Sequence, residues 1–180
     1  MSTLVIRAVW AQARDPEGRP ILGKDGGMPW HVPEDLQHFV AATTPHPMII
    51  GRTTWDSIPK KFRPFENRHT IVLTRQKGWQ PDPASTPERP VSVVHTKDEA
   101  LALAQQLATQ GVITIGGGEE IFRLYASELT ELIVTELDLE VDGDRYAPEI
   151  TSEWHASETS PWHESRICIL YRFVTYHRTV

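Results

Sequence analysis

Short apolar runs of β-strand character alternate with helical patterns along most of the 180-residue chain. The first strand is predicted at Thr3–Trp10, and the helix predicted at Pro33–Ala42 has Leu36, Phe39 and Val40 on one face. Further strands are predicted at Met48–Gly51, His69–Thr74, Val91–Val94 and Val112–Ile115. Further helices are predicted to begin near Thr53, to span Lys97–Gln110 with Gly111 at the C′ position, and to pass through Ile121 and Tyr125.

Two extended runs near the C-terminus, Glu131–Asp138 and Arg166–His177, alternate with period two and have no long helix between them. Parallel neighbours need a crossover connection, so this pair is predicted to be antiparallel. The fold class is therefore α/β. We expect one domain over residues 1–180, a three-layer α/β/α arrangement with a mostly parallel, mixed central sheet that ends in the antiparallel C-terminal pair. Cys168 falls within the second run and is predicted to lie in the core.

Two segments follow neither period. Trp79–Pro90 contains four prolines, and strand patterns flank it, so we predict a surface loop. Arg14–Gly27 is rich in glycine, and irregular segments of this length are more often functional than idle. We interpret the second segment as a lid, whose conformation the pattern does not define.

The composition restricts the class of protein. With 39% hydrophobic residues the chain can form one sizeable core, and its single cysteine excludes an intramolecular disulfide. No apolar run approaches the about eighteen residues of a membrane span, and Arg7 interrupts the N-terminal run Leu4–Ile6, which favours a strand over a signal peptide. We therefore expect a cytoplasmic protein. No metal site is predicted, because four histidines lack ligand spacing: His31, His38, His46 and His69.

The charge is distributed unevenly. A net charge of −6 disfavours nucleic acid or anionic lipid as a partner of the whole surface. Between Arg52 and Lys77, however, seven basic residues stand against two acidic ones. This segment suits an anionic ligand, although a solvated basic face is the alternative interpretation.

The run from Gly26 to Phe39 carries candidate chemistry. Pro33 suits the first turn of a helix, where Glu34 and Asp35 interact favourably with the helix dipole, and this alone describes an ordinary helix start. Asp35 also shares a face with Phe39, which directs a carboxylate toward an apolar cavity. A heterocycle that offers an amidine-like pair of N–H donors would satisfy it with a bidentate contact.

Gly116–Gly118 follow a predicted strand and open a predicted helix. Glycines at this place allow the backbone to approach a pyrophosphate at the positive end of the helix. A flexible turn is the alternative interpretation, and no G-x-G-x-x-G follows the first strand.

Three motifs together resemble the dihydrofolate reductase family. They are Pro-Trp-x-x-Pro-x-Asp-x-x-x-Phe ending at Phe39, Gly-Arg-x-Thr-Trp-x-Ser-Ile-Pro beginning at Gly51, and Ile115-Gly-Gly-Gly118. The resemblance covers nearly the whole chain, and bacterial, especially actinobacterial, members are the most similar. It extends to Trp10-Ala11-Gln12, Thr135-Glu136-Leu137-Asp138, Gly143-Asp144 and Tyr171-Arg172-Phe173.

The resemblance implies NADPH-dependent reduction of dihydrofolate to tetrahydrofolate, with hydride transfer to C6 and protonation of N5. Asp35 is implied as the carboxylate that holds the pterin, with Trp30 and Thr135 arranging water and polar contacts around it. Arg68 would bind the α-carboxylate of the substrate's glutamate, although Pro64-Phe65-Glu66-Asn67 precedes it where Pro-Leu-Pro-Gly is usual. The implied pterin and benzoyl pocket consists of Val9, Trp10, Met28, Leu36, Phe39, Ser57, Ile58 and Phe65.

The implied cofactor is NADPH. Arg52, Thr53 and Thr54 would contact its phosphates, and Thr74 with Arg75 would bind the 2′-phosphate. Either Phe122, by character, or Ile121, by count, takes the place of the family's usual tyrosine. The remaining implied cofactor residues are Ala11 and Leu22 near the nicotinamide, and Gly51, Ile115, Gly116, Gly117, Gly118 and Glu119.

Two other functions compete with this hypothesis. One is a reductase of the same fold that acts on another heterocycle, such as the pyrimidine reductases of flavin synthesis, and the combination of Asp35 with Trp30 and Phe39 disfavours it. The other is a nucleotide-binding module without activity, which would not need the acid. We expect a monomer that binds dihydrofolate and antifolate inhibitors.

Overall fold

The computed structural model describes residues 3–179, and the strands in that range join one mixed sheet. The strands are β1 Val5–Arg14, β2 Pro20–Gly23, β3 Met48–Gly51, β4 Thr70–Leu73, β5 Val91–Val94, β6 Val112–Gly117, β7 Glu131–Glu140, β8 Arg145–Tyr146, β9 Trp154–Thr159, β10 His163–Glu164 and β11 Leu170–Arg178. The helices are α1 Pro33–Thr43, α2 Arg52–Ser57, the 3₁₀ turn Lys60–Phe62, α3 Lys97–Leu107 and α4 Glu119–Leu124.

The sheet has the order β10-β11-β7-β1-β6-β3-β4-β5, with β2, β8 and β9 paired outside this path. The central strands from β7 to β5 run parallel to one another, whereas β11 is antiparallel to β7. Most of the parallel strands are connected through helices, whereas the long loop between β4 and β5 contains none, and the strand-rich return between β7 and β11 produces the antiparallel part. The predicted α/β class and the antiparallel C-terminal pair are confirmed.

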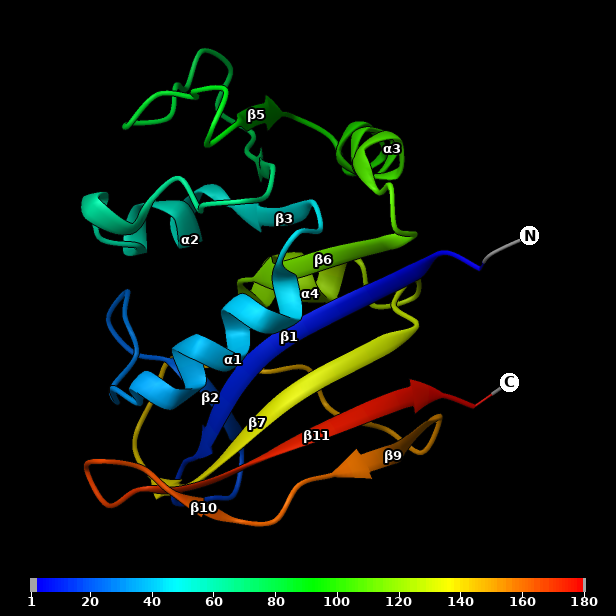
Figure 1. Ribbon diagram of the computed structural model, residues 1–180. Coiled ribbons are helices and arrows are strands. Elements are labelled where there is room, and N and C mark those ends of the chain that lie inside the picture. Colours follow the sequence, from blue (N-terminus) through cyan, green and yellow to red (C-terminus); the bar gives the residue numbers. More distant parts are fainter. Residues whose placement is uncertain (1–2, 180) are drawn as a thin grey trace.

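Helices pack on both faces of the sheet, as the alternation of β3 shows. Ile49 packs in one buried cluster with residues of α3 and α4, while Met48 and Ile50 pack in another with Trp55 of α2. Figure 1 shows α1 crossing in front of β1. Because both faces of β3 are covered, its sequence is a continuous apolar run rather than an alternating one.

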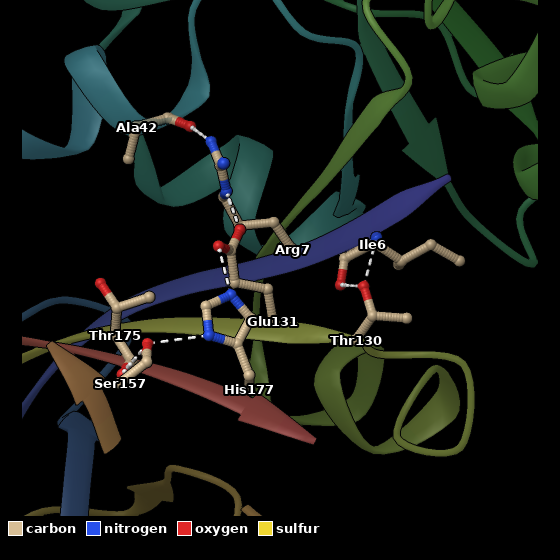
Figure 2. Close-up of polar contacts among 8 residues, drawn as sticks. All are labelled: Ile6, Arg7, Ala42, Thr130, Glu131, Ser157, Thr175 and His177. Carbon is tan, nitrogen blue, oxygen red and sulfur yellow. Dashed lines mark hydrogen bonds and ion pairs between the residues drawn. The ribbon is translucent and has the colours of Figure 1, made fainter. Parts of the chain in front are cut away.

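A polar network fastens the sheet near the amino ends of β1 and β7 (Figure 2). The Nε atom of Arg7 donates a 2.6 Å hydrogen bond to Glu131, and Nη1 of Arg7 donates a 2.8 Å bond to the carbonyl of Ala42 in α1. His177 of β11 lies 3.1 Å from the other Glu131 oxygen and 2.8 Å from the hydroxyl of Ser157 in β9. The network therefore joins α1 to four strands at a distance from the opposite, carboxyl edge of the parallel strands.

Three local predictions need correction. The helix predicted to reach Gln110 ends at Leu107, and the amide of Gly111 bonds to the carbonyl of Ala108 in a separate turn. The first strand continues to Arg14, so it ends later than predicted. The segment Arg14–Gly27 is not irregular throughout, because it contains β2, whose buried Ile21 anchors it between β1 and β8.

Cys168 does not lie in the core, so that prediction was wrong. It is exposed, has a φ of 63° and belongs to the turn before β11, which begins only at Leu170. The carbonyl and hydroxyl oxygens of Ser165 accept the amides of Cys168 and Ile169, and these bonds form the turn. The apparent alternation of the sequence there reflects a turn rather than a strand.

Candidate active site

A cleft of about 1270 Å³ opens at the carboxyl ends of the parallel strands β1, β3 and β6. The chain order reverses at this place, because β6 lies on one side of β1 and β7 on the other. Ligands of open α/β sheets bind at such switch points. The walls of the cleft come from α1, α2, the turn between β6 and α4, and the segments that follow β2 and β4.

Asp35 projects into this cleft from the first turn of α1, which Pro33 begins. Its Oδ1 atom accepts a 2.6 Å hydrogen bond from the hydroxyl of Thr135, a buried residue of β7. Burial raises the pKa of the Asp35 carboxyl above its usual range, and the hydrogen bond from Thr135 acts in the opposite direction. The site thus holds a carboxyl group that a ligand with N–H donors would stabilise in its charged form.

Apolar side chains surround Asp35. Trp10 and Trp30 are buried, and the indole Nε1 of Trp30 has no hydrogen-bond partner within the described residues. Met28 and Leu36 are 62% and 54% exposed although they are large and apolar. An exposed apolar patch inside a cleft indicates a binding surface for an apolar ligand.

Arg68 lies at the other end of the apolar wall and is only 6% exposed. Its Nη1 donates to the hydroxyl of Thr44, its guanidinium lies 4.7 Å from the centre of the Phe65 ring, and its Nε has no partner in residues 3–179. Burial lowers the pKa of Arg68 to about 10, with Glu66 opposing this shift, so the group stays charged at neutral pH. A buried cation without a paired acid is unfavourable by itself, and an anionic ligand would stabilise it.

The glycine turn, Gly116–Gly118, forms the floor of the second half of the cleft. Gly117 has a φ of +114°, and a Cβ atom there would lie 3.3 Å from the ring of Phe122. A Cβ atom on Gly118 would lie 3.2 Å from the hydroxyl of Thr54 in α2. Side chains would therefore close the gap between the turn and α2, and glycine keeps the backbone accessible.

Phe122 lies beneath this turn, where its ring packs at 5.3 Å from that of Trp10. Ile121 instead packs toward Gly51, at 3.1 Å from the place of a Cβ atom there. The two candidates for the usual tyrosine position therefore contact different walls, and only Phe122 contacts Gly117.

Basic and polar groups line the far end of the cleft, beyond the glycine turn. Arg75 is exposed and makes no ion pair with the described acids, whereas Arg52 is paired with Asp56 at 2.7 Å. Thr74 is buried, and its carbonyl accepts a 2.8 Å hydrogen bond from the His95 ring. The basic segment noted in the sequence thus contributes one free cation and one paired cation to this end.

Nearly all of the residues predicted for the site line the cleft. Ile115 does not, because it is fully buried in the sheet, and Thr135 lies behind Asp35. The predicted residues that line it are Val9, Trp10, Ala11, Leu22, Met28, Trp30, Asp35, Leu36, Phe39, Gly51, Arg52, Thr53, Thr54, Ser57, Ile58, Phe65, Arg68, Thr74, Arg75, Gly116, Gly117, Gly118, Glu119 and Phe122.

Several lining residues were missed by the sequence analysis: Thr44, His95, Lys97 and Arg145. Each is an ordinary polar residue at the end of an element, and no periodicity distinguishes it from a solvated position. Residues 3–179 contain no group of three or more His, Cys, Asp or Glu side chains that could hold a metal ion. No helix within the same range is long and apolar enough to cross a membrane.

Comparisons with known proteins agree with this geometry. The family model described as dihydrofolate reductase matches residues 5–178. A dihydrofolate reductase of Mycobacterium leprae is 36% identical over 97% of this chain and 99% of its own length, and one of Neisseria gonorrhoeae is 36% identical over 86% and 89%. Among solved structures, dihydrofolate reductase from Enterococcus faecalis complexed with NADP(H) and RAB-propyl matches with a TM-score of 0.81 and 32% identity, covering 98% of this chain and 97% of that one.

Proposed function

The chain belongs to the dihydrofolate reductase family and catalyses the NADPH-dependent reduction of dihydrofolate to tetrahydrofolate, and we propose that Asp35 is its catalytic carboxylate. The observation that carries this role is the placement of Asp35 on the apolar wall of the cleft, held there by Thr135. The two N–H donors of the pterin's amidine-like edge match the two oxygens of one carboxylate.

Asp35 binds and orients the ring and supports the addition of a proton at N5. Its raised pKa matters here, because an acid or base is most effective when its pKa lies near the working pH. The buried indole N–H of Trp30 has no hydrogen-bond partner among residues 3–179 and is free to hold a water molecule beside the carboxylate. Thr135 positions the carboxylate through its hydroxyl group.

The substrate's remaining parts follow the apolar wall. Leu36 and Phe39 of α1 face the benzoyl group from one side, and Ile58 and Phe65 contribute to the other. Arg68 binds the α-carboxylate of the glutamate with its planar guanidinium, which supplies the anion that this buried cation lacks. The whole substrate is thereby fixed at both ends, which sets the position of C6.

The residues at the other half of the cleft fit NADPH. When bound there, the cofactor supplies a hydride from C4 of its nicotinamide to C6 of the pterin. The glycine turn and Thr54 form the narrow passage for the pyrophosphate, since side chains at either glycine would close it. Thr74 and Arg75 bind the 2′-phosphate, and Ala11 and Leu22 lie at the nicotinamide end.

One assay tests this function. Purified protein is mixed with NADPH and dihydrofolate, and the loss of absorbance of the reduced nicotinamide is followed. We expect turnover that needs both compounds. If a pyrimidine intermediate of flavin synthesis replaced dihydrofolate with equal efficiency, or if neither substrate was reduced, the assignment would be wrong.

We further propose that the chain acts as a monomeric, single-domain enzyme in the cytoplasm and that antifolate inhibitors bind against Asp35. All walls of the cleft come from one chain, so a second subunit is not needed to complete it. The single cysteine makes the fold independent of intramolecular disulfides, which suits a reducing compartment. Analytical ultracentrifugation tests the monomer.

A further inference from the structure

We propose that Arg145 of β8 is a further cofactor-binding residue, which contacts the pyrophosphate of NADPH, and that Glu119 is the residue that positions it. The inference rests on the placement of the cofactor along the glycine turn. It assigns a role to a lining residue for which neither the sequence motifs nor the charge pattern gave any signal.

The two residues of β8 point to opposite sides of the strand, as the period of a strand requires. Arg145 lines the cleft that contains the glycine turn. Tyr146 instead lines a separate polar cavity of about 790 Å³, where the guanidinium of Arg19 lies 5.1 Å from the centre of its ring. The direction of the Arg145 side chain is therefore set by the anchoring of its neighbour on the other side.

Glu119 fixes the distance between β8 and the glycine turn. It directly follows Gly118, and its Oε1 accepts a 2.7 Å hydrogen bond from the backbone amide of Tyr146. Arg123 lies 3.9 Å from its other oxygen. Both carboxylate oxygens of Glu119 thus have protein partners, so the side chain is a strut between the turn and β8 rather than a group that extends toward the ligand.

The strand β2 holds β8 from its other edge. Arg145 pairs with Gly23, and a Cβ atom on Gly23 would lie only 2.7 Å from the carbonyl of Gly27. The absence of a side chain at Gly23 lets β2 and its following turn pack closely beside Arg145. The arginine is consequently presented by two hydrogen-bonded neighbours rather than by a free loop.

Electrostatics explains why a cation is useful at this place. The glycine turn is followed by two acidic residues, Glu119 and Glu120, which disfavour a doubly charged pyrophosphate nearby. Arg52 on the facing wall is already paired with Asp56. Arg145 is exposed and forms no ion pair with any acid in residues 3–179, so its charge is available to offset this repulsion.

The test compares the binding of NADP⁺ and NAD⁺ to the whole protein by calorimetry. Both nucleotides contain the pyrophosphate, so Arg145→Ala should weaken both by the same factor, about three- to tenfold for a partly solvated charged contact. Arg75→Ala should weaken the binding of NADP⁺ alone. Lys24→Ala is the matched control, because Lys24 is an exposed cation next to Gly23, the residue that pairs with Arg145, and lies outside the cleft lining, so both affinities should stay unchanged.

Variants of Glu119 test the positioning role. Glu119→Gln keeps an acceptor for the Tyr146 amide, whereas Glu119→Ala removes it. The amide should stay protected from hydrogen exchange in the first variant and lose protection in the second. Glu119→Ala should also weaken both nucleotides, although simple charge removal would tighten their binding.

Equal affinities of wild type and Arg145→Ala for both nucleotides would overturn the proposal, as would a loss confined to NADP⁺. If Glu119→Ala tightened the binding of both nucleotides, the positioning role of Glu119 would be wrong. A different result would show that the proposed position of the cofactor is wrong. In that case neither Arg75→Ala nor Arg145→Ala would change the affinity for NADP⁺, although NADP⁺ still bound to the wild type.

Discussion

Thr135 and Asp35 are 100 positions apart in the sequence, and the hydroxyl of Thr135 donates a 2.6 Å hydrogen bond to Oδ1 of Asp35. One residue comes from β7 and the other from the first turn of α1. A hydroxyl group that donates to a carboxylate stabilises its charged form, and burial destabilises that form. The protonation state of the site is therefore set by two opposing effects, one of which a single substitution removes.

Thr135→Val should raise the pKa of Asp35 further, because it deletes the hydrogen bond and leaves the burial. We expect the inflection of kcat/KM that belongs to Asp35 to move to higher pH. The lost bond is worth about 0.5 to 1.5 kcal/mol, so activity at neutral pH should fall about two- to tenfold. Thr135→Ser keeps the hydroxyl and serves as the control. An unchanged pH profile in Thr135→Val would show that the bond has no influence on the reaction.

Arg68→Lys should raise KM for dihydrofolate by about ten- to a hundredfold, because an ammonium group cannot form two parallel N–H bonds to a carboxylate. The contact is remote from C6, so kcat should change less. A dihydropterin without the glutamate tail should be used equally well by wild type and variant. Equal losses on both substrates would make Arg68 structural.

If Arg68 proved to be structural, Lys61 would be the better candidate for binding the glutamate tail of the substrate. Arg63 is excluded by its contacts, since its guanidinium donates to the carbonyls of Trp55, Ile58 and Asp82 and holds the loop together.

Arg75→Ala should narrow the preference for NADPH over NADH by about tenfold to a hundredfold, the value of one charge-assisted phosphate contact. Arg75 is unpaired among the described residues, so its charge is fully available. Arg52 is held by Asp56, and Arg52→Ala should narrow the preference less. Steady-state kinetics with both cofactors measures this. Equal losses with NADH and NADPH would remove Arg75 from the 2′-phosphate site.

The main features of the fold were predictable because they depend on local pattern. The apolar strand β3 and the start of α1 at Pro33 depend only on residues that are close in the sequence, and the structure has both. The resemblance to the family added residues that pattern alone cannot connect, such as Asp35 with Thr135. Their contact depends on the sheet order, which no local periodicity records.

The errors have two physical origins, one local and one long-range. The turn at Cys168 is held by hydrogen bonds from backbone amides to the oxygens of Ser165. The apolar neighbours Ile167 and Ile169 gave this turn the pattern of a strand. The strand β2 is only four residues long, and its partner β8 lies more than a hundred positions later. Half-buried Thr44 and exposed Arg145 were missed because polar residues of this kind acquire a role only when distant elements meet.

Asp35→Asn should make the protein more stable at neutral pH while it removes activity. The pKa of the Asp35 carboxyl is raised in the folded state, so its contribution favours folding at low pH and is lost as the pH rises through that raised value. Asparagine carries no charge and does not show this loss. Thermal melts should give a higher Tm for the variant at pH 7, with a difference that shrinks as the pH falls. A lower Tm at pH 7 would indicate that the carboxylate stabilises the fold.

The role of Asp35 is the central claim, and the pH dependence of kcat/KM for Asp35→Asn tests it most directly. The loss of an acid–base group typically costs about a hundredfold or more. Oxidation of NADPH by dihydrofolate should therefore be slowed at least this much at neutral pH, and the deficit should grow as the pH rises, because dihydrofolate protonated from solution then becomes scarcer. Turnover close to that of the wild type at neutral pH, in a variant that folds normally, would contradict the account.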